Sequence, residues 1–445
     1  MLTNSEDLPT QPPCRLPARD SLAAIVPLQP MSSTSADSVA VPGASIARRR
    51  VFIAILAMLS VIIPCGIAWQ LRVPMNTGSS DFASFYAAGK IINSGQGTRL
   101  YDWSKQVVVQ NAIPTDGRQN GFLPYAHAPF EALPFTLLAR LPYSVAVWLW
   151  WGFNLTLPYV CIWVLLPLVP FLAARLEQVL ISIGLFFPFV VAECQGQDSI
   201  ITLLLCTLSF VCLTRRQFWM AGTIYKPPLA LPLILILAIS SKKKVPIVAG
   251  FLSSCLLLLF VSVALVGWSG VIEYPKFLAV FAASPNEHYH VLEMPNLRGL
   301  YFSIFGSFLP DLTIIRAIQI TSSLLFIYVG WLLFRSKLEQ REAPLAFSLA
   351  IVTTVLVAFH EYGHDLSVMF LPVLLVWNYA GETRPLGAKP NLPMPIVAVM
   401  LFGPILTLVV PQIYTVFSIG YLIVLCRQIH MTSNTLPPQR LDVTT

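Results

Sequence analysis

The chain has 445 residues, and its 28 basic and 21 acidic side chains make up only 11% of them, whereas 56% are hydrophobic. A soluble globular protein carries about 25% charged residues, because its surface must be solvated. A disordered protein has far too little apolar content to match this composition. The composition therefore excludes both classes and predicts a multi-spanning membrane protein.

The net charge of +7 is not distributed as a nucleic-acid-binding surface would be. Basic residues occur in short groups between apolar runs, which is typical of cytoplasmic loops under the positive-inside rule. The sequence contains no nucleotide-binding glycine motif and no nucleic-acid-binding module, so we expect no nucleic-acid partner. The groups are Arg48–Arg50, Arg215–Arg216, Lys242–Lys244 and the trio Arg335, Lys337 and Arg341.

The amino-terminal part predicts a tail, one span and a long external loop. Residues 1–47 are polar and rich in proline and serine, which indicates a disordered cytoplasmic tail. Val51–Leu71 is an apolar run of about 20 residues, enough to cross a bilayer. Residues 72–142 follow outside. In this loop we expect short helices at Asp81–Asn93 and Trp103–Ala112, and a re-entrant or interfacial segment at Ala128–Ala139.

The rest of the chain predicts an all-α polytopic fold with ten spans and both termini inside, comprising a transmembrane domain over 48–428 and a cytoplasmic tail over 429–445. Gln217–Ser241 is interrupted by Lys226-Pro227-Pro228 and has basic residues on both flanks. We interpret it as a broken helical hairpin that enters the membrane and returns to the same side. The further spans are predicted at Tyr143–Pro170, Gln178–Ala192, Ile200–Leu213, Val245–Val266, Leu312–Phe334, Pro344–Phe359, Leu366–Tyr379, Leu392–Val410 and Ile413–Leu425.

With this topology the outward-facing segments are 72–142, Glu193–Asp198, Trp268–Asp311 and His360–Asp365. Five of the six histidines and many acids fall on that side. Titratable groups at a membrane boundary are costly unless they act or pair, so we expect a polar site on the outer face. The acids are Asp81, Asp102, Glu193, Asp198, Glu273, Glu287, Glu293, Glu361 and Asp365.

A series of short motifs begins in the first external loop, where Asp81 opens an aromatic-Tyr-Ala-Ala-Gly segment that ends at Gly89 and is followed by Leu100-Tyr101-Asp102. Over roughly residues 50–380, the order and placement of these motifs resemble those of glycosyltransferase family 87. The later motifs are Tyr125-Ala126-His127-Ala128-Pro129-Phe130, Gly196-Gln197, Ala221-Gly222 with Lys226-Pro227, Pro295-Asn296-Leu297-Arg298-Gly299, and His364-Asp365-Leu366.

The resemblance implies a GT-C membrane enzyme that takes a hexose, mannose in the first instance, from a polyprenyl phosphate. The sugar would pass with inversion to a lipid-linked or extracytoplasmic glycan acceptor. The family's catalytic carboxylate falls on Asp81, which would act as the general base. Further candidate substrate-binding residues are Tyr86, His127, Gln197, Lys226, Arg298, His360, His364 and Asp365.

The same resemblance implies the plasma membrane, in a bacterium the inner membrane, with the active site on the outer face. The implied partners are the bilayer, the lipid-linked sugar donor and the glycolipid or glycan acceptor. No metal ligand is assigned, and a role for a divalent ion stays open.

Alternative interpretations stand beside these assignments. An aspartate before a helical run is also a favoured N-cap, which offers Asp81 a purely structural role. Lys226 can extend to the cytoplasmic interface instead of facing a phosphate. A transporter is the non-enzyme alternative. His360-Glu361-x-x-His364 matches the H-E-x-x-H zinc motif of metalloproteases, although Gly363 suggests that a helix ends there.

Overall fold

The computed structural model describes residues 42–70, 80–113, 122–214, 226–240, 244–282, 290–336, 342–383 and 394–435. Within these ranges the secondary structure is helical and includes no β-strand, which confirms the predicted all-α class. By its internal contacts the chain divides between Arg48 and Arg49 into two units. The first unit contributes only residues 42–48 to the described part, as the start of helix α1 (Pro42–Gln70). The second unit holds the remaining helices.

The apolar helices make the chain a polytopic membrane protein. Five stretches are long and apolar enough to cross a membrane, and α8 (Leu176–Leu185) with α9 (Phe187–Gln195), bent by 47°, counts as a sixth if the pair is one crossing. The five lie in α1, in α6 (Tyr143–Leu165) with the following turn to Leu168, and in α12 (Lys244–Ala282), α15 (Asp311–Ser336) and α19 (Ile413–Thr435).

The other four predicted spans form helices of fewer than 18 residues, so the predicted count of ten is not reproduced by helix length. They are α10 (Ser199–Thr214), α16 (Ala343–Val357), α17 (Phe370–Glu382) and α18 (Met394–Phe402). Of the predicted hairpin, only the returning limb, α11 (Pro227–Ser240), lies within the described residues. Residues 215–225, which include the Ala221-Gly222 motif, lie outside them, as do the predicted tails over 1–41 and 436–445.

Three boundaries differ from the prediction for local reasons. Helix α1 begins at Pro42, so residues 42–47 are helical rather than part of the tail; proline is favoured in a first helical turn. Helix α19 continues past residue 428, because no glycine or proline interrupts it before Thr435. The predicted single span Gln178–Ala192 is bent, since Pro188 at the start of α9 removes a helical hydrogen bond.

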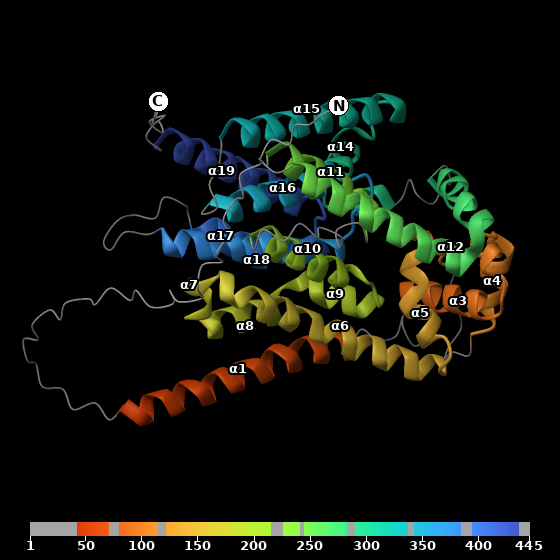
Figure 1. Cartoon of the computed structure of the whole chain (residues 1–445), viewed down its shortest axis with the longest axis horizontal. Coiled ribbons are helices and arrows are strands. Elements are labelled where there is room, and N and C mark those ends of the chain that lie inside the picture. Colours follow the sequence, from red (N-terminus) through yellow and green to blue (C-terminus); the bar gives the residue numbers. More distant parts are fainter. Residues whose placement is uncertain are drawn as a thin grey trace, which may run out of the picture. The chain divides into compact units, whose positions relative to one another are not determined.

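Helix α16 lies at the centre of the second unit. It packs against α11, α15, α17 and α19, and nearly all of its side chains are buried (Figure 1). A helix that is apolar all round is stable only when neighbours cover every face, which explains why this segment carries no polar stripe. The loop that leaves its carboxyl end carries the His360–Asp365 segment of the candidate site.

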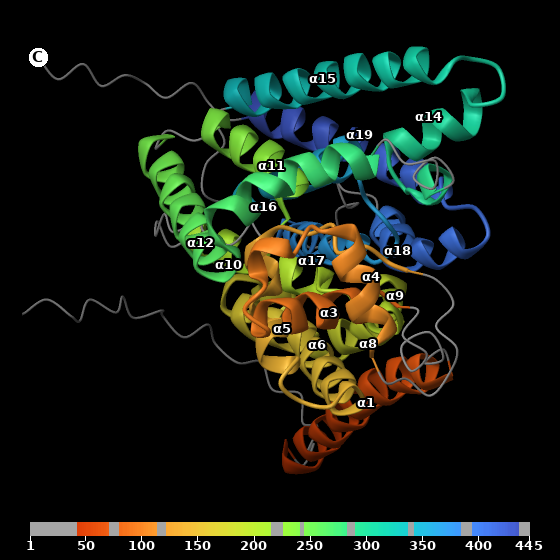
Figure 2. The ribbon, with the colours of Figure 1, turned by 90° about the vertical axis from the view of Figure 1, so that its right-hand side faces the viewer.

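The described residues 80–113 and 122–142, which belong to the predicted first external loop, form a second packed region, here called the α3–α5 region. Helices α3 (Asp81–Asn93), α4 (Trp103–Asn111) and α5 (Leu133–Leu138) gather together, and the turn Pro129–Ala132 precedes α5 (Figure 2). The two predicted short helices are thereby confirmed almost residue for residue. Their core is aromatic, and α12, which breaks at Gly267, packs against it. The core rings are Phe82, Phe85, Tyr86, Tyr101, Tyr125, Phe135, Tyr143, Trp150 and Phe277.

We expect Gly89→Ala to destabilise the protein, because Gly89 lies where α3 crosses α5. An added Cβ atom would be 2.2 Å from the carbonyl oxygen of Phe135 and 2.8 Å from Cβ of Ala139. Relief of such overpacking costs about 1–3 kcal/mol, seen as a lower midpoint of thermal unfolding in detergent. Gly420→Ala in α19 is the control, since its Cβ would meet no atom within 4 Å. Equal midpoints for the two variants would contradict the prediction.

Candidate functional site

The turn between α9 and α10 organises the site. Gly196 ends α9 with a φ of 67°, a left-handed conformation that glycine adopts without strain, and the chain then presents Gln197 and Asp198. Two side chains of α6 donate hydrogen bonds to the backbone of this turn. The indole N–H of Trp150 donates to the Gly196 carbonyl at 2.8 Å, and the Asn154 amide donates to the Gln197 carbonyl at 2.7 Å.

The carboxylate of Asp81 is tied to this turn. Nε2 of Gln197 donates to Oδ2 of Asp81 at 2.6 Å, which joins the start of α3 to the turn across 116 positions of sequence. Asp81 is the first residue of α3, and the N-cap position belongs to Ser80. The carboxylate of Asp81 therefore has a long-range partner, which the N-cap interpretation does not require.

Lys226 lies at the start of α11 and faces the same turn. Its ammonium contacts Oδ1 of Asp365, and Nζ donates to the hydroxyl of Ser199 at 3.1 Å. The Ser199 hydroxyl in turn donates to Oδ1 of Asp365 at 2.8 Å, and Nζ is 4.0 Å from Oδ1 of Asp198. The start of α10, the start of α11 and the loop after α16 thus meet at one buried ammonium. This placement favours a site role for Lys226 over extension to the cytoplasmic interface.

His364 completes this side of the cluster. Its Nε2 is 3.3 Å from Oδ2 of Asp365, and its Nδ1 is 2.6 Å from Oε1 of Gln195 at the end of α9. Burial raises the pKa of Asp365, but His364 and Lys226 beside it outweigh burial and hold that pKa well below its usual range. Asp365 is therefore an anion that balances the ammonium.

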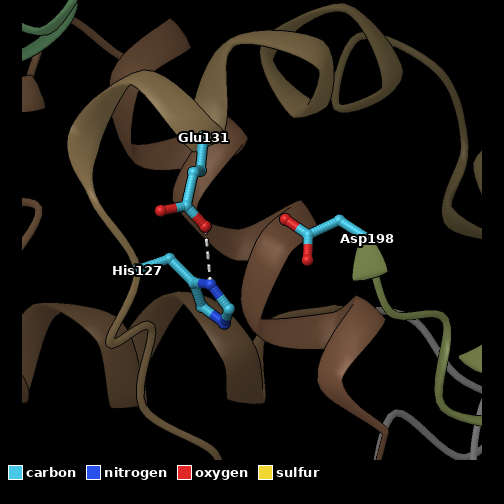
Figure 3. Close-up of side chains that lie close together, drawn as sticks. All are labelled: His127, Glu131 and Asp198. Atoms are coloured by element: carbon cyan, nitrogen blue, oxygen red, sulfur yellow. Dashed lines mark hydrogen bonds and ion pairs between the residues drawn. The ribbon is translucent and has the colours of Figure 1, made fainter. Parts of the chain in front are cut away.

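Beside Asp198, His127 pairs with Glu131 (Figure 3). Nδ1 of His127 is 2.8 Å from Oε2 of Glu131, whose Oε1 accepts the backbone N–H of Ala128 at 3.0 Å. Burial lowers the pKa of His127, yet the Glu131 carboxylate more than compensates, and the net direction is upward. Burial also raises the pKa of Glu131, and the histidine only partly offsets this.

Three members of this site escaped the sequence analysis: Glu131, Ser199 and Gln195. Glu131 carried a usable signal, because it is the one charged residue within the apolar segment Ala128–Ala139 and such a charge needs a partner. Ser199 and Gln195 carried none, since polar residues at helix ends are common.

Two predicted substrate-binding residues have other contacts. The Tyr86 hydroxyl donates to the Leu141 carbonyl at 2.6 Å, and the Tyr86 ring packs in the aromatic core of the α3–α5 region. Arg298 donates to the Phe359 carbonyl at 3.0 Å, and its guanidinium lies 3.9 Å from the centre of the Phe359 ring. With Asn296, whose amide donates to the Ala358 carbonyl at 2.9 Å, Arg298 holds the loop after α16.

The H-E-x-x-H segment does not lie on a helix. Helix α16 ends at Val357, and the next helical turn begins at Asp365, so His360 and His364 are not one turn apart on a helical face. Burial lowers the pKa of His360 to about 4, which makes it a neutral imidazole at physiological pH. Burial and the neighbouring Asp365 raise the pKa of Glu361 well above its usual range. The motif therefore lacks the geometry that zinc proteases use.

An apolar cavity of about 520 Å³ opens one helical turn before Gln197. Glu193 of α9 reaches it, and neither of its carboxylate oxygens accepts a hydrogen bond from any residue that the structure describes. The lining also includes α1 and α6, with the residues Ile62, Pro64, Cys65, Gly66, Trp69, Trp148, Trp151, Gly152 and Leu155. Its walls suit an aliphatic chain rather than a polar ligand.

Comparison with known proteins gives one match. The model of glycosyltransferase family 87 matches residues 125–359, which is more than half of the chain and narrower than the predicted 50–380. His127, Gln197, Lys226 and Arg298 fall inside the matched range, and Asp81 lies outside it. No curated protein and no solved structure gives a significant match.

The raised pKa of Glu361 predicts that the stability of the protein depends on pH, and that Glu361→Gln removes this dependence. A buried Glu361 keeps a proton that the unfolded chain releases above a pH of about 4.3, so the stability of the native protein falls as the pH rises from there toward the raised pKa. Relative to Glu361→Gln, the free energy of unfolding of the native protein should fall by up to about 1.4 kcal/mol per pH unit.

Thermal unfolding of the native protein and of Glu361→Gln between about pH 4.5 and 8 measures this difference. Both proteins contain Lys226 and Asp365, so the contributions of these two residues cancel in the comparison. Glu273→Gln, at a half-exposed position on α12, is the control and should follow the native curve. Parallel curves for the native protein and Glu361→Gln would contradict the prediction.

Proposed function

Because the chain belongs to glycosyltransferase family 87 and is therefore a membrane glycosyltransferase, we propose that it transfers a hexose, mannose in the first instance, from a polyprenyl phosphate carrier. The acceptor is a lipid-linked or extracytoplasmic glycan. Membership of this family replaces the transporter and the zinc protease as interpretations of the chain. We also propose that it lies in a bacterial inner membrane, with both termini in the cytoplasm and the site on the outer face.

The observation that carries the proposal is the placement of Asp81 against the Lys226 cluster. Gln197 holds the Asp81 carboxylate at 2.6 Å and adjoins Asp198, which lies 4.0 Å from Lys226. A general base and a cation therefore meet at one turn, as transfer from a sugar phosphate requires.

The proposed reaction is a single displacement. Asp81 accepts the proton of the acceptor hydroxyl while its oxygen forms a bond to the anomeric carbon. The bond between that carbon and the phosphate oxygen breaks, and the polyprenyl phosphate leaves with the electron pair. Attack opposite the leaving group inverts the anomeric carbon, so a β-linked donor gives an α-linked product.

Lys226 is the group that we assign to the leaving phosphate. Its ammonium is fixed by Asp365 and Ser199, so it is oriented before substrate binds, which is the arrangement that stabilises developing charge most effectively. His364 is a second donor at the same place, since it is held by Gln195 and Asp365. We assign the sugar hydroxyls to Gln197.

The polyprenyl chain needs an apolar surface beside these groups. The cavity between α1, α6 and α9 supplies one, and Glu193 places it one helical turn from Gln197. We therefore assign the first isoprene units of the donor to this cavity.

Asp81→Asn should lower kcat by about 10²–10⁴-fold, the contribution expected of a general base. Asparagine still accepts the Gln197 hydrogen bond, so folding and KM should change little. The measurement is transfer from labelled polyprenyl-phosphate mannose in membranes or detergent. Asp311→Asn, at the matching first position of α15, is the control. Turnover near the native value in Asp81→Asn would overturn the assignment of the base.

Gly152→Leu should fill part of the cavity and raise KM for a long-chain donor by about tenfold or more, because each buried methylene is worth roughly 0.8 kcal/mol. A Cβ at Gly152 meets no atom within 4 Å, so the side chain enters open space. Gly420→Leu in α19 is the control, with an equally open Cβ position. A donor with a shortened lipid should lose less affinity than the long-chain donor. An unchanged KM for both would contradict the lipid assignment.

A further inference from the structure

A second group of ionisable side chains adjoins the Lys226 cluster. His127, Glu131 and Asp198 each offer one metal-ligand atom, and these three atoms lie within 4.8 Å of one another (Figure 3). Across the described ranges, this is the one grouping of three or more His, Cys, Asp or Glu residues with such spacing. The residues come from the loop before α5 and from the α9–α10 turn, so two separately folded parts of the chain create the group.

Asp198 is the member whose charge is least satisfied. Its side chain is fully buried, and neither carboxylate oxygen accepts a hydrogen bond from any described residue. It precedes α10 directly, yet it does not cap the first-turn N–H groups of that helix. Lys226 Nζ is 4.0 Å away, beyond hydrogen-bond distance, and contacts Asp365 instead. A buried carboxylate in this state is costly and favours a further cation beside it.

His127 and Glu131 each keep a donor atom available for a cation. Nδ1 of His127 is 2.8 Å from Oε2 of Glu131. An imidazole that donates its Nδ1–H to a carboxylate keeps a lone pair on Nε2, which can bind a metal ion. Glu131 also accepts the Ala128 N–H, but a carboxylate has about four lone-pair sites, so these two bonds do not exhaust it.

We propose that His127, Glu131 and Asp198 bind one divalent transition-metal cation of the Mn²⁺ or Zn²⁺ class. One imidazole and two carboxylates form a mixed donor set, which suits these ions better than the all-oxygen sites of Ca²⁺. Ligand bonds of about 2.0–2.2 Å allow at most about 4.4 Å between two donors, so three atoms that lie within 4.8 Å of one another would move closer together as they bind the ion. Three protein ligands leave a coordination position open to water or to a substrate oxygen.

The cation would correct a charge imbalance in the site. The Lys226 ammonium contacts Asp365 and lies 4.0 Å from Asp198, whereas Glu131 pairs with His127, and a donor phosphate would add a further negative charge. A metal ion beside Asp198 offsets this repulsion where the leaving phosphate lies. That role rests on the proposed function, whereas binding of the ion by the three side chains does not.

The test is direct metal binding to the full chain, purified in detergent, stripped with a chelator and dialysed. Mn²⁺ is titrated in, and the free ion is followed by electron paramagnetic resonance, with Zn²⁺ as a competitor. We expect about one site per chain, weakened at least about 100-fold in Asp198→Asn and in His127→Ala. His290→Ala is the matched control, because His290 also pairs with a glutamate, Glu293 at 3.5 Å, but is exposed. Its binding should equal that of the native chain.

Thermal unfolding shows that each variant is folded, and Mn²⁺ should raise the midpoint of the native protein and of His290→Ala but not of Asp198→Asn. The absence of saturable binding by either ion overturns the proposal, as does binding that Asp198→Asn retains; a protonated His127 then balances the carboxylates. Since neither donor nor acceptor is present, this result stands apart from the transfer assay on Asp81→Asn.

Discussion

The burial of one lysine ammonium in a largely apolar protein is the constraint on which the site depends. A charge in such surroundings is tolerated only when it is paired and hydrogen-bonded. Lys226 meets this requirement through Asp365 in the loop after α16 and through Asp198 and Ser199 at the start of α10. Removing either member of the central pair leaves the other buried and uncompensated, which is far more costly than losing a surface ion pair. The starts of α10 and α11 and the loop after α16 are therefore bound to a common point.

The α9–α10 turn connects the Lys226 cluster to the α3–α5 region. Asp198 faces both Lys226 and the His127–Glu131 pair, and the adjacent Gln197 reaches Asp81. The α3–α5 region has its own aromatic core, which packs α3 against α5 and contacts α12. Two stable regions thus approach each other with charged and polar groups at their junction. Preorganised groups of this kind favour reaction over mere binding, because they do not need to reorient as charge develops.

The sequence was sufficient for features that depend on local pattern. Hydropathy gave the membrane class, and the short helices at Asp81–Asn93 and Trp103–Asn111 follow from their own residues and caps. The count of ten spans is not confirmed, because an apolar run does not reveal whether its helix is full length or, as at Pro188, bent. Contacts between distant residues had no local signature: Lys226 and Asp365 are 139 positions apart. Arg298 was a substrate-binding candidate through the motif that resembles the family, whereas its contacts with Phe359 are visible only in three dimensions.

The assignment of Asp81 as the proposed general base also depends on contacts between distant residues, because the family match begins at residue 125 and leaves Asp81 outside. Its assignment consequently depends on geometry rather than on the match. Gln197 lies inside the matched range, and its side-chain amide is the direct bond from that range to the Asp81 carboxylate. An amide N–H donated to one carboxylate oxygen leaves the second oxygen to accept a proton from an acceptor hydroxyl. Asp81, one of the candidates that the match omits, is therefore hydrogen-bonded to a candidate that the match includes.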